Sequence, residues 1–101
     1  MAHTLEKKVK IKVVNILEEA GAYYFYPVTG GYGASGVPDV VACFKKKFIG
    51  IECKAGTKVP TALQLKHLKS ITENGGYALV INESNIEDLK DCIKIIMEAE
   101  K

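Results

Sequence analysis

Arginine is missing from this chain of 101 residues, so lysine supplies every permanently basic side chain. The chain has 14 lysines against 12 acidic residues, which gives a net charge of +2. So small an excess does not by itself indicate a polyanionic partner. The positions of the lysines therefore carry more information than their number.

Cysteine is scarce, and its three copies, Cys43, Cys53 and Cys92, are far apart in the chain. No CxxC pair is present, which argues against a zinc site or a dithiol redox centre. Cys43 and Cys53 lie inside apolar segments, where a free thiol behaves as a small buried hydrophobic group. Free thiols of this kind are typical of a reducing compartment, so we expect a cytoplasmic protein.

Long apolar stretches are also missing, because no segment approaches the ~20 residues of a membrane span. The N-terminal residues run directly into charged, helix-like sequence, so we expect no signal peptide and no membrane partner. The hydrophobic fraction of 48% is nevertheless sufficient for a core. A chain of this length fits one compact domain, residues 1–101.

The hydrophobic pattern predicts an α/β domain with the element order α-β-β-β-α-β-α. Apolar residues at helical spacing predict a first helix over residues 5–20, ended by Gly21. An aromatic strand over 22–28 follows, and then a segment with four glycines in residues 29–36 that cannot form a regular element. Strands over 38–44 and 48–54, joined by three lysines, predict an antiparallel hairpin.

The second half of the chain predicts two helices around one strand. Thr61 is placed to cap a helix that ends at Gly75. The continuous apolar run of residues 77–81 is typical of a strand covered on both faces. Ser84 and Glu87 have the spacing of a capping box, which predicts a last helix with Ile86, Leu89, Ile93, Ile96 and Met97 on one face. We expect a central mixed sheet flanked by helices.

A carboxylate follows a proline where the first hairpin strand opens, at Pro38-Asp39, and packing does not require it there. Glu52 and Lys54 are two apart in the second strand, so their side chains project from one face with Cβ atoms about 6.5–7 Å apart. Gly50 shares that face and leaves room for another backbone or a ligand. If the hairpin pairs normally, Asp39 meets Glu52 and Lys54 at one end of the sheet.

Two carboxylates and an ammonium suit metal-assisted chemistry on a phosphate. Mg²⁺ is typically held by one or two carboxylates with waters and substrate phosphates, and the carbonyl oxygen of Cys53 could add a neutral ligand. Lys54 could orient water or stabilise developing negative charge. The alternative is a surface salt bridge between Lys54 and one of the two acids, which contributes about 0–1 kcal/mol of stability. We would prefer this interpretation if the E-x-K motif stood alone. Asp39 and the hairpin shift the interpretation towards function.

The ordered motifs resemble the PD-(D/E)XK nuclease superfamily, and within it the virus-type replication-repair nuclease (VRR-NUC) domain. The resemblance covers nearly the whole chain, and its matching parts are Glu6, Gly30 to Gly36, Pro38-Asp39, Glu52 with Lys54, Gln64 and Gly75-Gly76. It implies a restriction-endonuclease-like core and Mg²⁺- or Mn²⁺-dependent hydrolysis of phosphodiester bonds. It also implies a phage or bacterial endonuclease that acts as a homodimer on branched DNA, such as four-way junctions or flaps.

The site residues that we expect on this basis form three groups. Asp39 and Glu52 are the predicted metal ligands, with the Cys53 carbonyl and Glu6 as further candidates. Lys54 is the predicted charge-stabilising residue, and Gln64 could hydrogen-bond Lys54 or a phosphate. The candidate nucleic-acid contacts are Tyr32, Ser35, Lys7, Lys10 and Lys66. Lysines of this kind attract a phosphate backbone without regard to its sequence.

Two other functions stay open at this point. A non-catalytic nucleic-acid-binding module on the same fold would fit if Asp39 and Glu52 failed to assemble a metal site. A small interaction protein, whose aromatic strand and last helix serve oligomerisation, would leave the acidic cluster unexplained. No small-molecule cofactor is expected in any of these cases.

Overall fold

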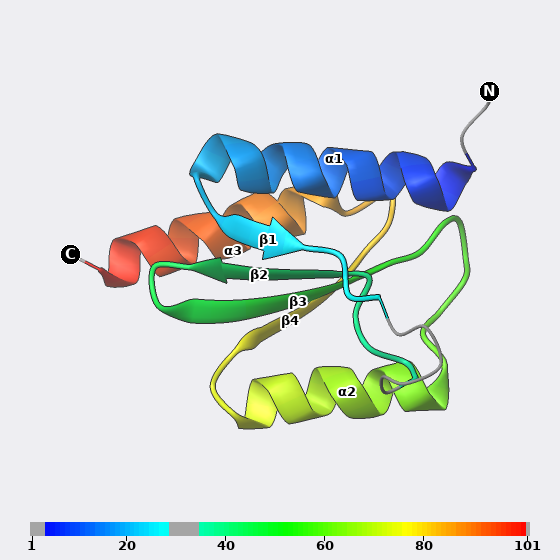
Figure 1. The fold of residues 1–101 in the computed structure, drawn as a ribbon. Coiled ribbons are helices and arrows are strands. Elements are labelled where there is room, and N and C mark those ends of the chain that lie inside the picture. Colours follow the sequence, from blue (N-terminus) through cyan, green and yellow to red (C-terminus); the bar gives the residue numbers. More distant parts are fainter. Residues whose placement is uncertain (1–3, 29–34, 101) are drawn as a thin grey trace.

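The computed structural model describes residues 4–28 and 35–100, and it confirms the predicted order of helices and strands (Figure 1). The elements are α1 (Leu5–Ala20), β1 (Tyr23–Phe25), β2 (Val40–Phe44), β3 (Lys47–Cys53), α2 (Ala62–Glu73), β4 (Tyr77–Ile81) and α3 (Ile86–Ala99). They form a single α/β domain around a mixed sheet, as expected.

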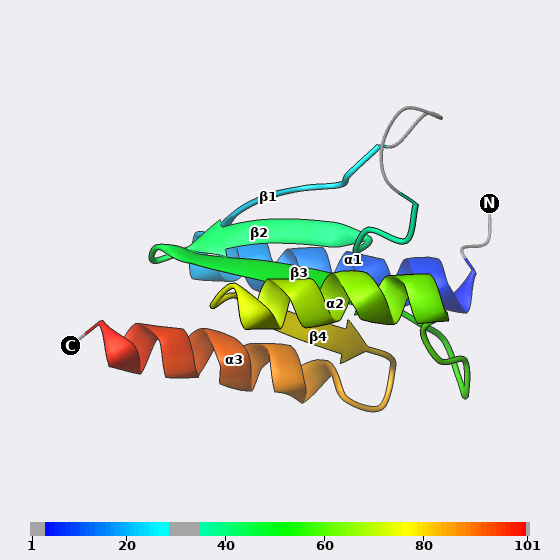
Figure 2. The same cartoon turned by 90° about the horizontal axis from the view of Figure 1, so that it is seen from below.

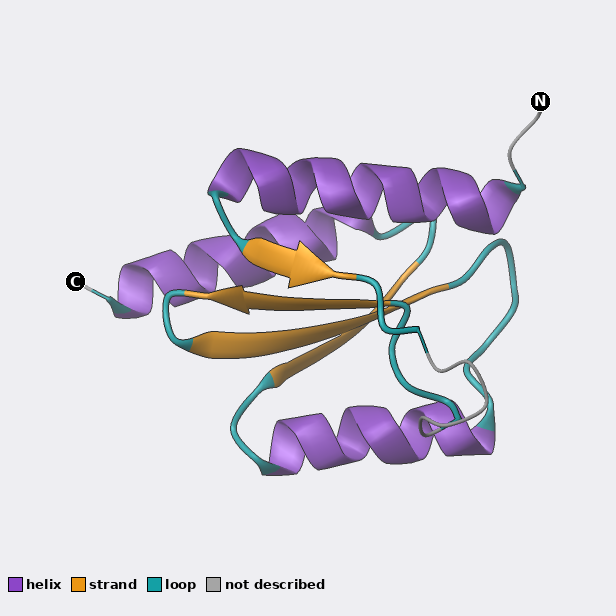
Figure 3. Cartoon of the chain, in the orientation of Figure 1, coloured by secondary structure: helices purple, strands orange, loops and turns teal. Residues whose placement is uncertain are grey.

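The four-stranded sheet has the order β1-β2-β3-β4. The pairs β1–β2 and β2–β3 are antiparallel, and β3–β4 is parallel. Helices α1 and α3 cover one face, and α2 lies on the other (Figures 1 and 2). Figure 3 shows that a long crossover containing α2 connects the two parallel strands. β3 is thereby an inner strand whose C-terminal end is held from both sides.

The core lies between the sheet and the pair α1 and α3. Alternate residues of β2 and β3 supply the sheet side, and Val13, Leu17 and Leu89 are fully buried against them from the helices. Each fully buried aliphatic side chain contributes about 1.5–3 kcal/mol relative to an exposed one. Because Ile49, Ile51 and Cys53 face this apolar layer, Gly50 and Glu52 lie on the opposite face of β3.

Two predicted helix ends are confirmed, Gly21 after α1 and Thr61 before α2, and Thr4 is an N-cap that was not predicted. The Thr4 hydroxyl accepts a hydrogen bond from the Lys7 N–H at 3.1 Å, and Gly21 ends α1 with a φ of 79°. Thr61 caps α2 in a complete capping box with Gln64. Each cap satisfies N–H or carbonyl groups that the helix itself leaves unpaired.

The predicted capping box of the last helix is wrong. Asn85, not Ser84, is the N-cap of α3, and its side chain makes no cap hydrogen bond. Instead its amide donates to the Val80 carbonyl at 2.8 Å and its oxygen accepts from the Asn82 N–H at 2.7 Å. Asn85 thus ties the β4–α3 turn together. Met97 is also 50% exposed, and Cys92 takes a buried place on this helix.

The strand boundaries differ from the prediction in two places. β1 is confined to Tyr23–Phe25. The β2–β3 turn contains only Lys45 and Lys46, with φ values of 49° and 72°, and Lys47 already belongs to β3. Two successive residues with positive φ match the twist of a tight hairpin, a geometry that usually selects Asn and Gly.

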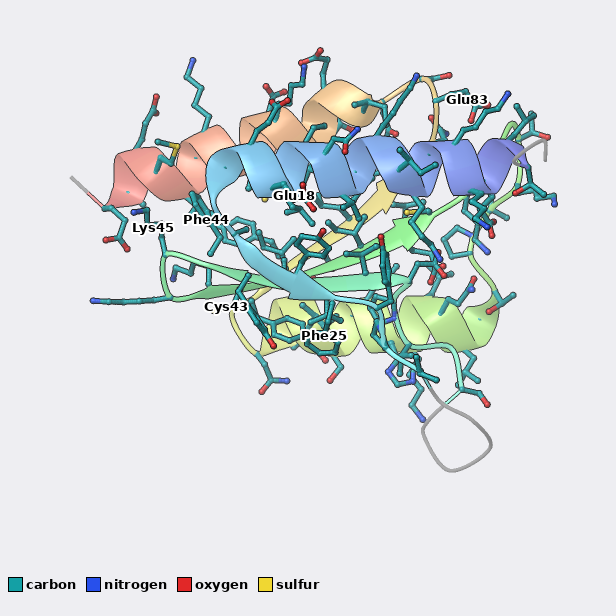
Figure 4. The ribbon with its side chains drawn as sticks, turned by 45° about the horizontal axis from the view of Figure 1, so that its top comes forward. Glu18, Phe25, Cys43, Phe44, Lys45 and Glu83 are labelled. Carbon is teal, nitrogen blue, oxygen red and sulfur yellow. The ribbon has the colours of Figure 1, made fainter. Side chains whose placement is uncertain are left out.

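The α2 face of the sheet is only partly covered. α2 contacts β3 and β4 and leaves β1 and β2 largely open. Tyr23, Phe25, Cys43 and Phe48 are consequently exposed, and Figure 4 shows Phe25 and Cys43 on this side of the sheet. The prediction that Cys43 is buried is therefore wrong, because this residue lies on the part of the α2 face that the helix does not reach. In the described part of the chain no helix is long and apolar enough to cross a membrane.

Candidate active site

The pairing of β2 with β3 brings the two predicted carboxylates together. Val40 lies opposite Ile51 in the register, so Asp39, one residue earlier, lies opposite Glu52. The Cys53 N–H donates a hydrogen bond of 2.8 Å to Asp39 Oδ2. Asp39 is therefore fixed to the backbone of the strand that carries Glu52.

Glu52 is the one buried polar or charged residue in the described part of the chain, with 1% of its surface exposed. Its Oε2 is also the one buried side-chain oxygen or nitrogen there that has no hydrogen-bond partner. Burial, followed by a side-chain hydrogen bond and the charge of Asp39, raises the pKa of Glu52 to about 8. A carboxylate buried without a partner is costly in a stable fold. The surroundings of Glu52 thus favour its neutral, protonated form.

Lys54 lies at the same end of the sheet, directly after β3. Its backbone N–H donates to the Ile81 carbonyl at 2.9 Å, which holds this residue against the end of β4. The positive charge of Lys54 lowers the pKa of Glu52, against the stronger effects of burial and Asp39. The structure therefore brings together the three residues on which the predicted site depends.

Helix α1 adds two charges beside this group. Glu6 and Lys10 are one turn apart, and both are half-buried. The charge of Glu6 contributes to the raised pKa of Glu52, and that of Lys10 acts to lower the pKa of Cys53. Residues 4–28 and 35–100 contain no group of three His, Cys, Asp or Glu side chains placed to hold a metal ion. Glu6 thus faces the carboxylate pair without completing a three-residue cluster.

The Cys53 thiol takes no part in this arrangement. Its side chain is fully buried in the core beside Ile49 and Ile51. Burial, as the largest effect, raises the pKa of this thiol to about 12. A neutral, buried thiol is not a ligand for a hard cation, so only the backbone of Cys53 can serve the site.

A cleft of about 350 Å³ opens beside Asp39. It is lined by Lys10, Tyr26, Pro27, Ser35, Gly36, Val37, Pro38, Asp39 and Gln64. The lining includes Lys10 of α1 and Gln64 of α2, two helices that lie on opposite faces of the sheet. Four predicted site residues line this cleft: Lys10, Ser35, Asp39 and Gln64.

Gln64 differs from its prediction in one respect. Its Oε1 accepts the Thr61 N–H at 2.8 Å, and its own N–H donates to the Thr61 hydroxyl at 3.2 Å. The carboxamide oxygen is therefore engaged in capping α2 rather than bonded to Lys54. The T-x-x-Q spacing was the sequence signal for this arrangement.

Gly50 does not leave room for a ligand, contrary to the prediction. A Cβ at this position would lie 2.5 Å from Ile71 Cδ1 and 3.1 Å from Pro38 Cγ. The space is filled by α2, which packs directly on the backbone of β3. Gly50 thus allows the close approach of α2, and it does not enlarge the site.

The remaining predicted contacts lie in different places. Lys7 is exposed on α1 and Lys66 is exposed on α2, and neither lines the cleft beside Asp39. Tyr32 lies outside the described residues. The Ser35 carbonyl is 2.9 Å from His67 Nε2, which fastens the approach to Asp39 onto α2. No sequence pattern pointed to His67 in this role.

Comparison of the chain with known protein families finds no matching family model, and no curated protein matches it. The interpretation of the site therefore depends on its own chemistry. That chemistry consists of a buried carboxyl group with a raised pKa, a second carboxylate beside it, a neighbouring lysine and an adjoining polar cleft.

Proposed function

We propose that this chain is a metal-dependent nuclease of the VRR-NUC group that hydrolyses phosphodiester bonds. The observation that carries the proposal is the placement of buried Glu52, with an oxygen that lacks a partner in the described structure, against Asp39 and near Lys54. Perturbed carboxylates that gather beside a cleft are typical of catalytic sites.

The residues present suit a divalent cation. Asp39 and Glu52 would hold Mg²⁺ or Mn²⁺, with the carbonyl oxygen of Cys53 as a neutral ligand and Glu6 as a more distant carboxylate. Oxygen donors of this kind are those that both metals prefer. When bound, the cation would lower the pKa of a coordinated water and neutralise charge on the phosphate.

The protein side chains have separate tasks in this proposal. Asp39, fixed by the Cys53 N–H, keeps one carboxylate at a constant position. Glu52 would hold the cation in its ionised form, because a ligand carboxylate must be deprotonated. Lys54 stabilises the negative charge that develops on the phosphate or orients the attacking water.

A cleavage assay tests this proposal. Purified protein would be incubated with Mn²⁺ or Mg²⁺ and with four-way junction, flap and linear duplex DNA. We expect metal-dependent cleavage that is lost in Lys54→Ala and kept in Lys58→Ala, a matched change at an exposed lysine of the following loop. If no substrate is cleaved, or if Lys54→Ala cleaves normally, the proposal is wrong.

A non-catalytic nucleic-acid-binding module is the second candidate. It is favoured by one observation, the lack of a three-residue ligand cluster in the described part of the chain. Calorimetry separates the two functions. Mn²⁺ binding that disappears in Asp39→Asn supports the nuclease, and metal-independent DNA binding without cleavage supports the module.

Our proposal also includes branched DNA as the substrate class, a homodimer as the active form and the cytoplasm as its location. A dimer would place two sites on opposite strands of a junction. The exposed aromatic face formed by Tyr23, Phe25 and Phe48 is the surface that we propose for it. Light scattering on the wild type and on Tyr23→Lys tests this, since a monomeric wild type would exclude the dimer.

A further inference from the structure

The cleft beside Asp39 leads away from the other two central residues. Asp39 lies in its lining, whereas Glu52 and Lys54 do not. Its lining also includes Lys10 of α1 and Tyr26, which follows β1. A strand whose scissile phosphate lay at the carboxylate pair would therefore run its next nucleotide into this cleft.

Lys10 is held over the cleft by an aromatic ring. Its Nζ lies 5.4 Å from the centroid of the Tyr26 ring, a distance at which a cation is attracted to the ring face. Tyr26 is itself supported by Tyr24, whose ring lies edge-on to it at 6.2 Å. The Tyr24 hydroxyl donates a hydrogen bond to Glu18 of α1. A chain of contacts thus runs from Glu18 through Tyr24 and Tyr26 to the Lys10 ammonium.

The opposite wall of the cleft also favours an anion. Gln64 contributes to this wall, and its carboxamide nitrogen is the group left over when its oxygen caps Thr61. The wall contains the N-terminal turn of α2, where the helix dipole is positive. Gly36 lies close to this turn, because a Cβ at position 36 would be 3.2 Å from the backbone nitrogen of Gln64. The cleft thus has donors on two sides and a carboxylate only at its inner end.

We propose that this cleft binds the backbone phosphate that flanks the scissile one, with Lys10 as the binding group and Tyr26 as its positioning residue. The inference rests on the proposed nuclease function, and it names how that site holds its nucleic-acid strand. Lys10 makes the ion pair with the flanking phosphate. Tyr26 keeps the ammonium in the cleft, where an unsupported lysine side chain would sample many rotamers.

Binding to a short single-stranded DNA, measured by fluorescence anisotropy in EDTA, tests the inference without cleavage. Loss of one phosphate contact lowers the slope of log K against log salt by about 0.7–0.9. We therefore expect Lys10→Gln to lower the slope by this amount and the affinity about five- to tenfold near 0.1 M salt. Lys12→Gln, an exposed lysine of the same helix outside the cleft, is the matched control.

Tyr26 variants separate a positioning role from a purely structural one. Tyr26→Phe keeps the ring and should bind as the wild type does. Tyr26→Leu loses the cation–π contact and should bind about two- to fivefold more weakly, with an unchanged melting temperature. In cleavage assays Lys10→Gln should raise KM and leave kcat unchanged, whereas Lys54→Ala should lower kcat.

A neutral methylphosphonate placed beside the cleavage position identifies the phosphate that Lys10 contacts. It should weaken binding by the wild type and have no further effect on Lys10→Gln. An unchanged salt slope in Lys10→Gln, or equal binding by Tyr26→Leu and Tyr26→Phe, would overturn the inference while leaving the nuclease proposal intact. A lack of metal-dependent cleavage would overturn the nuclease proposal, and the salt slope would still decide whether Lys10 binds a phosphate.

Discussion

Replacing Glu52 by glutamine should stabilise the metal-free protein at neutral and alkaline pH while removing its metal binding. Glu52 is 1% exposed, and its pKa is raised from 4.5 to about 8, mainly by burial. The unfolded chain therefore loses this proton near its ordinary pKa, whereas the folded chain keeps it until about pH 8. The wild-type protein becomes less stable as pH rises through this window.

The size of the effect follows from the width of the window. One pKa unit corresponds to about 1.4 kcal/mol, so each pH unit between 4.5 and 8 removes at most that amount. Between pH 5 and pH 7 the wild type should lose about 2 kcal/mol that Glu52→Gln retains. For a domain of this length, such a difference moves the melting temperature by roughly 10 °C.

Urea unfolding in EDTA at several pH values measures this difference directly. Glu73→Gln, a change at an exposed glutamate of α2, should follow the wild type at every pH. Added Mn²⁺ should stabilise the wild type and leave Glu52→Gln unaffected. If wild type and Glu52→Gln show the same pH dependence, the carboxyl group is not held protonated by its surroundings and the reasoning fails.

Three further predictions concern other parts of the molecule. Mn²⁺ affinity should fall about tenfold per pH unit below pH 8, because Glu52 must release its proton; calorimetry would contradict this by giving a pH-independent constant. Gly50→Ala should cost about 1 kcal/mol of unfolding free energy, since its methyl group would lie 3.1 Å from Cγ of the rigid Pro38 ring and would displace the end of the Ile71 side chain, and an unchanged urea midpoint would refute the contact. Lys46→Gly should stabilise by about 1 kcal/mol because φ is 72° there, whereas Lys47→Gly, within β3, should destabilise in the same urea assay.

The parts of the fold that were predictable are those governed by short-range pattern. Residues 5–20 repeat their apolar positions at helical spacing, and α1 has these bounds. The meeting of Asp39 with Glu52 was predictable because a short polar turn leaves few registers for a hairpin. In both cases residues close together in the sequence determine the structure.

The errors arose where a distant segment decides the outcome. Gly50 looked like space for a ligand, but Ile71, which is 21 positions later, occupies that space. Ser84 and Asn85 are both good helix caps, and contacts to β4 decide how Asn85 is used. Cys43 is exposed only because α2 stops short of β2, and no local pattern encodes the reach of a helix over a sheet.

The tight turn of the hairpin has a consequence for the opposite end of the molecule. Since Phe44 pairs with Lys47, every later pair in the ladder, up to Asp39 facing Glu52, is counted from that turn. A slip of the pairing by one residue at this turn would send one acid to the other side of the sheet. The register that is set at this surface turn, about five residue pairs away, thus decides whether the two acids face one another.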